Sequence, residues 1–238
     1  MTTEPADTAE PADTTEPADT AEPADTAEPV GTADGAEPVE AVVFDLGNVL
    51  VRWEAERAFD GVLTDAEVER FLADVDFPAL NLRQDAGRSW REARDEVART
   101  HPEHAATVDL YVERFAHALP GPVPGSAEVV DELRAAGVRV LGLTNWSAET
   151  YHHGERVAPV IGRLEGVVVS GREGVVKPDP RIFAVLADRH GLDPARTVFV
   201  DDSPANVAGA AALGYQAVLF TGAAALRADL VARGALPR

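Results

Sequence analysis

Residues 41–51 read Ala41-Val42-Val43-Phe44-Asp45-Leu46-Gly47-Asn48-Val49-Leu50-Val51, and this stretch decides the fold. Four apolar residues, two of them β-branched, lead into Asp45 and then into a Gly-Asn pair, which is typical of a buried strand that ends in a turn. In open parallel α/β sheets, ligands bind at the carboxyl ends of the strands, so an acid there would point into a site. Asp is also common in turns, so this stretch alone leaves a ligand-facing role and a turn-capping role equally open.

Beyond Pro124, short apolar runs alternate regularly with helical segments. We expect strands near residues 138–143, 166–170, 197–200 and 215–220, and helices near residues 126–136, 148–157, 181–190, 204–213 and 223–233. This alternation favours a mostly parallel sheet with helices on both faces. The sequence therefore predicts an α/β fold whose core comprises residues 39–51 and 121–238.

Residues 52–120 have a different character, because they contain no convincing strand. Thr64 and Ser89 are typical helix N-cap residues, each followed by an acid three positions later and by amphipathic helical spacing. A helical segment of this length, placed directly after the first strand, indicates an insertion that covers the site as a cap. The alternative is a helical subdomain that takes no part in binding.

The N-terminal segment repeats a six-residue unit over residues 3–29, seen as Thr-Ala-Glu-Pro-Ala-Asp and near copies. Proline in every unit and the lack of large apolar side chains prevent a packed core, so we predict that residues 1–38 are a disordered acidic tail. Such a tail serves as a solubilising or spacing arm, and partner binding is the alternative role.

The formal charge of −20 is concentrated in this tail. Residues 1–40 contain twelve acidic and no basic residues, so the remaining chain carries only −8. A moderately acidic body argues against nucleic-acid binding. The chain has no cysteine, no apolar leader and no uninterrupted apolar span, so we expect a soluble cytoplasmic protein without membrane contact, as a monomer or homodimer.

Polar side chains follow four of the predicted strands, where they share one edge of the sheet. Three carboxylates brought together there repel one another unless a cation lies among them, and hard oxygen ligands without His or Cys select Mg²⁺. Because Mg²⁺ commonly combines few protein carboxylates with substrate phosphate, we expect a small phosphorylated metabolite as the ligand. Asp45 can then act as nucleophile, while Thr144 and Lys177 hold phosphate oxygens. The strand-end residues are Asp45, Thr144, Asn145, Lys177, Asp201 and Asp202.

Lys177 is the only lysine among twenty-one basic residues, the others being arginine. An ammonium group is a compact point charge, whereas a guanidinium is a planar fork, so this choice favours a specific role beside a carboxylate. Asn145 and Trp146 follow Thr144 directly. We expect them to lie at the mouth of the site and to contact substrate.

Four motifs occur in order between about Val42 and Phe220. At these residues the sequence resembles the haloacid dehalogenase superfamily, which implies a Rossmann-like core, an inserted helical cap, Mg²⁺ dependence and phosphate monoester hydrolysis through an aspartyl-phosphate. The motifs are Phe44-Asp45-Leu46-Gly47-Asn48-Val49-Leu50, Leu143-Thr144-Asn145, Lys177-Pro178-Asp179-Pro180 and Val200-Asp201-Asp202-Ser203.

The resemblance also implies roles for single residues. Asp45 would be nucleophile and metal ligand, and Gly47 would offer its backbone carbonyl to the metal. Asp202 would be the direct ligand of the acidic pair, while Asp201 would act through water or by orienting Lys177.

Gly47 departs from the phosphatase pattern, which usually has a second Asp here as general acid and base. A missing acid costs roughly 10²- to 10⁴-fold in rate unless the substrate, a water or a cap residue supplies the proton. The Gly-Asn variant resembles the subgroup of sugar-phosphate phosphatases of the α-glucose-1-phosphatase type. An anomeric phosphate is a good leaving group and would need less protonation.

Two other functions remain open from the sequence. Metal-independent 2-haloacid dehalogenases also lack the second Asp and share the Lys-Pro-Asp-Pro motif, although the adjacent Asp201-Asp202 pair argues for a cation and hence for a phosphatase. A non-catalytic module that binds a phospho-ligand or a protein would use the acidic tail as its interaction arm. Metal-dependent phosphate release separates these functions.

Overall fold

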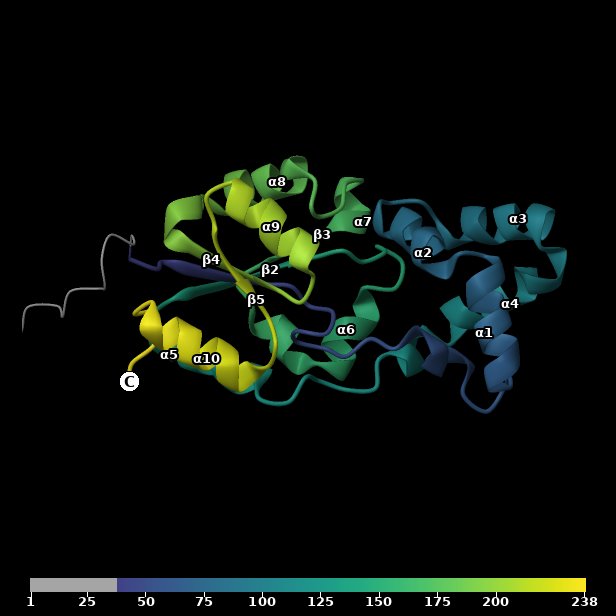
Figure 1. The fold of residues 1–238 in the computed structure, drawn as a ribbon, viewed down its shortest axis with the longest axis horizontal. Helices are drawn as coiled ribbons and strands as arrows, with labels where there is room; N and C mark the ends of the chain where they lie inside the picture. The colour runs from purple at the N-terminus through teal and green to yellow at the C-terminus, as the bar shows by residue number, and fades with distance from the viewer. Residues whose placement is uncertain (1–37) are drawn as a thin grey trace, which may run out of the picture. The chain divides into compact units, whose positions relative to one another are not determined.

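The computed structural model describes residues 38–238, and its centre is a parallel sheet with the strand order β3-β2-β1-β4-β5 (Figure 1). The predicted tail, residues 1–38, lies outside the described residues except for its last position. The chain runs outward from β1 to β3 and then returns to the other side of β1, so the topological switch point lies between β1 and β4. Ligands of open α/β sheets bind at this point. The strands are β1 (Ala41–Phe44), β2 (Arg139–Thr144), β3 (Val167–Val169), β4 (Thr197–Asp201) and β5 (Gln216–Leu219).

Helices cover both faces of the sheet, so the fold is α/β and Rossmann-like, as predicted. On one face lie α5 (Ser126–Ala135) and α10 (Ala223–Ala232), and on the other lie α8 (Pro180–His190) and α9 (Pro204–Ala212) (Figure 1). Because successive strand residues point to opposite faces, β1 supplies both cores. Its Val42 and Phe44 belong to one buried apolar cluster, whereas its Ala41 and Val43 belong to the other.

Two short helices follow strands at the carboxyl edge of the sheet, namely α6 (His152–Val157) and α7 (Ser170–Glu173). The helix predicted for residues 148–157 begins four residues later than expected. Residues 148–151 form a turn instead, in which the Trp146 side chain donates a hydrogen bond to Thr150 at 3.1 Å. This turn keeps Trp146 at the edge where the strands end.

Residues 52–120, termed the insertion below, form a helical segment around an aromatic core. The capping boxes expected at Thr64 and Ser89 are both present. The two connections to the sheet run side by side, since the Arg52 amide donates to the Gly121 carbonyl at 2.9 Å. The insertion contains α1 (Asp65–Asp74), α2 (Phe77–Asp85), α3 (Trp90–Thr100), α4 (Ala105–Glu113) and the 3₁₀ helices Ala55–Phe59, Pro102–His104 and Phe115–Ala118.

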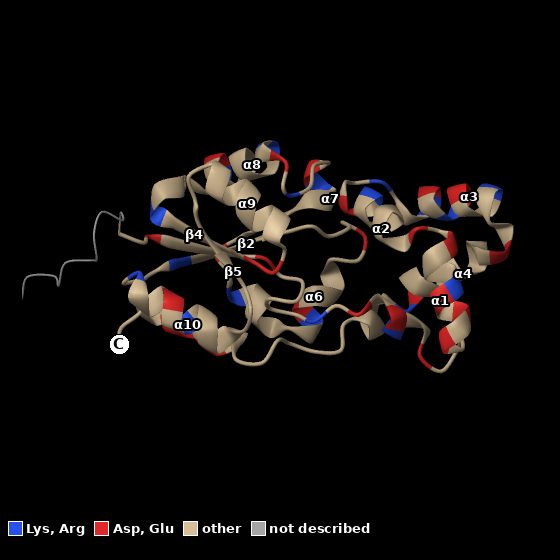
Figure 2. Cartoon of the chain, viewed as in Figure 1, with Lys and Arg blue, Asp and Glu red and all other residues tan. Residues whose placement is uncertain are grey.

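Acidic and basic residues are interspersed along the helices of the insertion (Figure 2). Glu96 on α3, for example, pairs with both Arg83 and Arg88. The insertion and the sheet belong to one compact unit, and their division into cap and core remains a prediction. Within residues 38–238, no helix combines the length and the apolar character that are needed to cross a bilayer.

Candidate active site

Asp45 is held at the carboxyl end of β1 by a tight loop. Its amide donates to the Val200 carbonyl of β4 at 2.8 Å, which continues the sheet by one residue. Its carboxylate oxygen Oδ1 accepts a hydrogen bond from the Leu46 amide at 2.7 Å, and the residue is only 8% exposed. Asn48 adopts a left-handed conformation with φ of 55°, which turns the chain directly after the acid. Asp45 therefore lies at the switch point, and its carboxylate is held in one orientation.

Asp201 and Asp202 bring two further carboxylates to the same place. Oxygen atoms of Asp45, Asp201 and Asp202 lie within 4.8 Å of one another. Asp201 is completely buried, and its carboxylate accepts hydrogen bonds from Lys177 at 2.7 Å and from the Asn206 amide at 3.0 and 3.2 Å. Asp202 is exposed, so its carboxylate remains accessible to an added ligand. The Asp201 carboxylate, by contrast, already accepts hydrogen bonds from Lys177 and Asn206.

Lys177 lies beneath this cluster and is 3% exposed. Its ammonium group donates to the Leu143 carbonyl at 2.8 Å and to Asp201 at 2.7 Å, and it lies 2.9 Å from Asp45 Oδ1. Three acceptors match the three protons of an ammonium group. The geometry therefore favours charge neutralisation by Lys177 over a further hydrogen bond to substrate.

Asn145 positions Lys177 rather than facing the cavity with a free amide. Its side-chain oxygen accepts from the Lys177 amide at 2.8 Å, and its side-chain nitrogen donates to the Lys177 carbonyl at 3.0 Å. The substrate contact predicted for Asn145 remains a prediction. It would have to use the hydrogen-bonding capacity of the Asn145 amide that these two bonds leave unused. Thr144, the last residue of β2, is buried beside Asn145 at 1% exposure.

The cluster carries three carboxylates against one ammonium group, and the pKa values reflect this imbalance. Burial raises the pKa of Asp45 to about 7, with Asp201 and Asp202 adding to the rise and Lys177 opposing it. Burial also raises the pKa of Asp202, and Asp201 reinforces the rise. For Lys177, burial acts to lower the pKa, but Asp45 and Asp201 outweigh it, so its pKa lies above the ordinary value. A cation would relieve this excess of negative charge.

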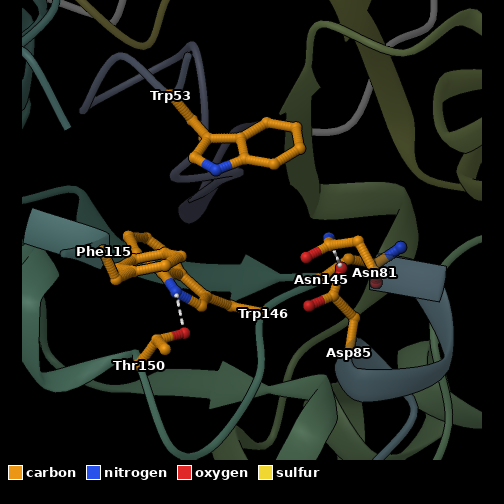
Figure 3. A pocket seen from close by; sticks show the side chains of 8 residues that line it. Trp53, Asn81, Asp85, Phe115, Asn145, Trp146 and Thr150 are labelled. Carbon is orange, nitrogen blue, oxygen red and sulfur yellow. Dashed lines mark hydrogen bonds between the residues drawn. The ribbon is translucent and has the colours of Figure 1, made fainter. Parts of the chain in front are cut away.

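A cavity of about 80 Å³ opens beside Gly47, between the insertion and the sheet. One side of it is aromatic and the other is polar, with Asn81 and Asp85 near Asn145 and opposite Trp146 (Figure 3). Trp146 is 7% exposed and lines the cavity with its indole ring, in line with its predicted place at the mouth. The lining residues are Gly47, Trp53, Asn81, Asp85, Phe115, Asn145, Trp146 and Thr150.

A sequence model described as a haloacid dehalogenase-like hydrolase matches residues 39–214, which is most of the chain. The chain belongs to this hydrolase family. The superfamily resemblance inferred from the four motifs is therefore confirmed.

Several curated proteins are similar in sequence to this hydrolase. Mouse acyl-CoA dehydrogenase family member 10 is 28% identical over 77% of the chain, but the match spans only 18% of that protein. Protein CbbY of Rhodobacter capsulatus is 27% identical over 76% of the chain and 85% of its own length. The (S)-2-haloacid dehalogenase 4A of Burkholderia cepacia is 28% identical over 40% of the chain and 41% of its own length.

Solved structures share the fold of this hydrolase. A family enzyme from Bacteroides thetaiotaomicron, determined as a magnesium complex, superimposes with a TM-score of 0.64 at 22% identity. The match covers 78% of the chain and 95% of that structure. At this level of identity, the likeness establishes the α/β fold and nothing finer.

Asp85 is a residue of this hydrolase site that the sequence reasoning missed. It is the last residue of α2 and 7% exposed, and Asn81 donates to its carboxylate at 2.9 Å. Burial raises the pKa of Asp85 to about 7, and a hydrogen bond from the Ser147 backbone opposes the rise. One local signal was available, since the helix dipole disfavours a carboxylate in the last turn of a helix. Such violations of local preference often mark functional positions.

Proposed function

We propose that this hydrolase is a Mg²⁺-dependent phosphatase of small phosphate monoesters. The observation that carries the proposal is the group of three carboxylates within 4.8 Å at the switch point, with the ammonium group of Lys177 bonded among them. The donor set fits Mg²⁺, because it contains only hard oxygen atoms and has more negative than positive charge. Asp45, Asp202 and the Gly47 carbonyl would hold the ion, and Asp201 would support it through water or through Lys177.

In this reaction the Asp45 carboxylate attacks phosphorus. An Asp45 oxygen–phosphorus bond forms while the bond between phosphorus and the leaving-group oxygen breaks, and water then cleaves the aspartyl-phosphate to release inorganic phosphate. Lys177 neutralises charge that develops on the phosphoryl oxygens, and the Thr144 hydroxyl donates to one of them. When bound, Mg²⁺ would supply further compensation of negative charge. Asn145 contributes by holding the Lys177 backbone in place.

The cavity walls support a sugar phosphate as the substrate class. Aromatic rings of Trp53, Phe115 and Trp146 face the polar groups of Asn81 and Asp85. Such a pair of walls matches the apolar C–H face and the hydroxyl groups of a sugar. The cavity of about 80 Å³ is small for a complete ligand site, so we propose that the insertion acts as a cap that opens for entry and closes over the substrate.

Metal removal gives the first test of this proposal. We expect Mg²⁺-dependent release of phosphate from p-nitrophenyl phosphate and from members of a sugar-phosphate panel. Chelation with EDTA should reduce the rate by at least ~10²-fold, since the ion compensates transition-state charge, and added Mg²⁺ should restore it. Phosphate release and chloride release from 2-chloropropionate are to be measured in parallel.

Three outcomes of that experiment separate the functions. Chloride release that is unaffected by EDTA, without phosphate release, would contradict the phosphatase in favour of a dehalogenase. Binding of phosphate analogues without turnover of any substrate would identify a binding module. Phosphate release that EDTA leaves unchanged would remove the proposed role of the ion.

A further inference from the structure

We propose that Asp85 is the general acid of this hydrolase, supplying from the insertion the proton that Gly47 cannot supply from the loop after β1. The inference rests on the proposed phosphatase function. A leaving alkoxide must be protonated as its bond to phosphorus breaks, and the absence of an acid would cost roughly 10²- to 10⁴-fold in rate. Gly47 has no side chain, so another group that reaches the same cavity must carry the proton.

Asp85 has the required position. Among the described residues that line the cavity beside Gly47, it alone has an ionisable side chain. Attacking and leaving oxygens lie on opposite sides of a transferred phosphoryl group. Asp45 follows β1 at the edge of the sheet. A leaving oxygen in line with it would therefore point away from the sheet, towards the insertion, whose Asp85 lines the cavity (Figure 3).

The carboxyl group of Asp85 is also held in place. Asn81 donates to its Oδ2 at 2.9 Å and the Ser147 backbone also donates to the carboxylate, one oxygen of which points towards the cavity (Figure 3). Its backbone carbonyl accepts a hydrogen bond from the Ser170 hydroxyl at 2.6 Å, which ties the end of α2 to the start of α7. The proton donor is therefore positioned by a contact that forms only when the insertion is seated on the sheet.

The surroundings favour the protonated form that an acid needs. The titratable groups that face Asp85 are Asp45 beyond β1, Lys177 before α8 and Tyr111 on α4. Burial and the negative charge of Asp45 raise the pKa of Asp85 to about 7, against the opposing effects of Ser147 and Lys177. The C-terminal end of α2 acts in the same direction, because its partial negative charge disfavours a carboxylate.

The proton balance closes over the two steps of the reaction. In the first step, Asp45 bonds to phosphorus, the leaving oxygen takes the Asp85 proton, and the alcohol departs. In the second step, the Asp85 carboxylate takes a proton from the water that attacks the aspartyl-phosphate, so phosphate leaves and both carboxyl groups return to their starting forms.

The test compares Asp85→Asn with the natural protein on two aryl phosphates. Phenol, with a pKa of ~10 like that of tyrosine, is a poor leaving group, whereas p-nitrophenol is far more acidic and leaves without a proton. We expect Asp85→Asn to lower kcat for phenyl phosphate by roughly 10²-fold or more, and for p-nitrophenyl phosphate by less than ~10-fold. The matched control is Asp109→Asn, which alters an exposed carboxylate of α4 and should leave both rates unchanged.

The pH dependence gives a second readout. With phenyl phosphate, kcat of the natural protein should fall as the pH rises through the pKa of Asp85, because the acid loses its proton. This falling limb should be absent in Asp85→Asn and weak with p-nitrophenyl phosphate. Ionisation of Asp45 changes kcat for both substrates in the same way. The difference between the two pH profiles therefore reports the ionisation of Asp85 alone.

A rescue variant tests the same proposal by restoring an acid at position 47. A Cβ atom at Gly47 would meet nothing within 4 Å, and Gly47 is not among the glycines with positive φ, so Gly47→Asp should be accommodated. We expect this change to raise the phenyl phosphate rate of Asp85→Asn by at least ~10-fold, and that of the natural protein by much less, because only the former lacks an acid.

The outcomes separate the acid from the phosphatase itself. Equal losses on both substrates in Asp85→Asn, or no loss on either, would overturn the role of Asp85 while leaving the phosphatase intact. A natural protein that hydrolyses neither phosphate would contradict the proposed function first. Below the raised pKa of Asp85, the melting temperature of Asp85→Asn should stay close to that of the natural protein, since the amide is isosteric with the protonated acid.

Discussion

Replacing Asp45 by Asn is expected to lower phosphate release from p-nitrophenyl phosphate by roughly 10⁴-fold or more, because a neutral amide cannot attack phosphorus. The change is sterically conservative. Both the Leu46 amide and the Lys177 ammonium contact the same oxygen, Oδ1, which the amide side chain retains. The natural protein, quenched in acid during turnover, should show by mass spectrometry a phosphoryl group on the peptide that contains Asp45, and the variant should not.

The stability of Asp45→Asn distinguishes lost chemistry from lost structure. Because the folded pKa of Asp45 is raised to about 7, ionised Asp45 destabilises the metal-free fold. This cost grows as the pH rises from the unfolded pKa of ~3.9 to the folded value, and it is fully present above it. We therefore expect Asp45→Asn, without metal at pH 8, to melt at or above the temperature of the natural protein.

The control for this variant is Asp60→Asn, which removes an acid that is 65% exposed on the insertion. It should keep full activity and an unchanged melting temperature. If Asp45→Asn kept more than about 1% of the natural rate, the nucleophile would have to be another group.

Replacing Lys177 by Arg is expected to reduce kcat/KM by roughly 10²- to 10³-fold, although the charge is conserved. The ammonium group lies within 3 Å of three acceptors, Leu143, Asp201 and Asp45, in a site that leaves the residue 3% exposed. A planar guanidinium on a different stem cannot satisfy this three-sided arrangement without displacing one carboxylate. The Asp45 carboxylate would then lose both its orientation and its nearest positive charge.

Kinetics with p-nitrophenyl phosphate, at a temperature where circular dichroism shows the variant to be folded, measure this effect. Arg181→Lys is the matched control, because it makes the reverse exchange on the same segment at a side chain that is 78% exposed. The kcat/KM of Arg181→Lys should fall by no more than ~2-fold, because exposed ion pairs contribute little. Rates near those of the natural protein in Lys177→Arg would remove the role assigned to Lys177.

Much of the fold and of the acidic site was visible in local patterns. A strand is recognisable from a few apolar residues, and a parallel sheet places the residues after each strand at one edge. Asp45, Lys177 and the Asp201-Asp202 pair were for this reason predicted to meet, and in the structure they do. The start of α6 was misplaced, because the turn before it depends on a side-chain hydrogen bond that periodicity does not reveal.

Tertiary structure alone decided which groups share the cavity and in which protonation state. Asp85 lines the same cavity as Gly47 only because the insertion packs on the sheet through contacts between distant segments, such as that of Ser170 with the Asp85 carbonyl. Its raised pKa follows from burial at that junction, and burial is a property of the assembled chain. The sequence by itself thus determined the sheet edge at which Asp45, Lys177 and the Asp201-Asp202 pair meet. The packing of the insertion determined the cavity walls and brought the Asp85 carboxyl group into them, because no local pattern encodes how two distant segments meet.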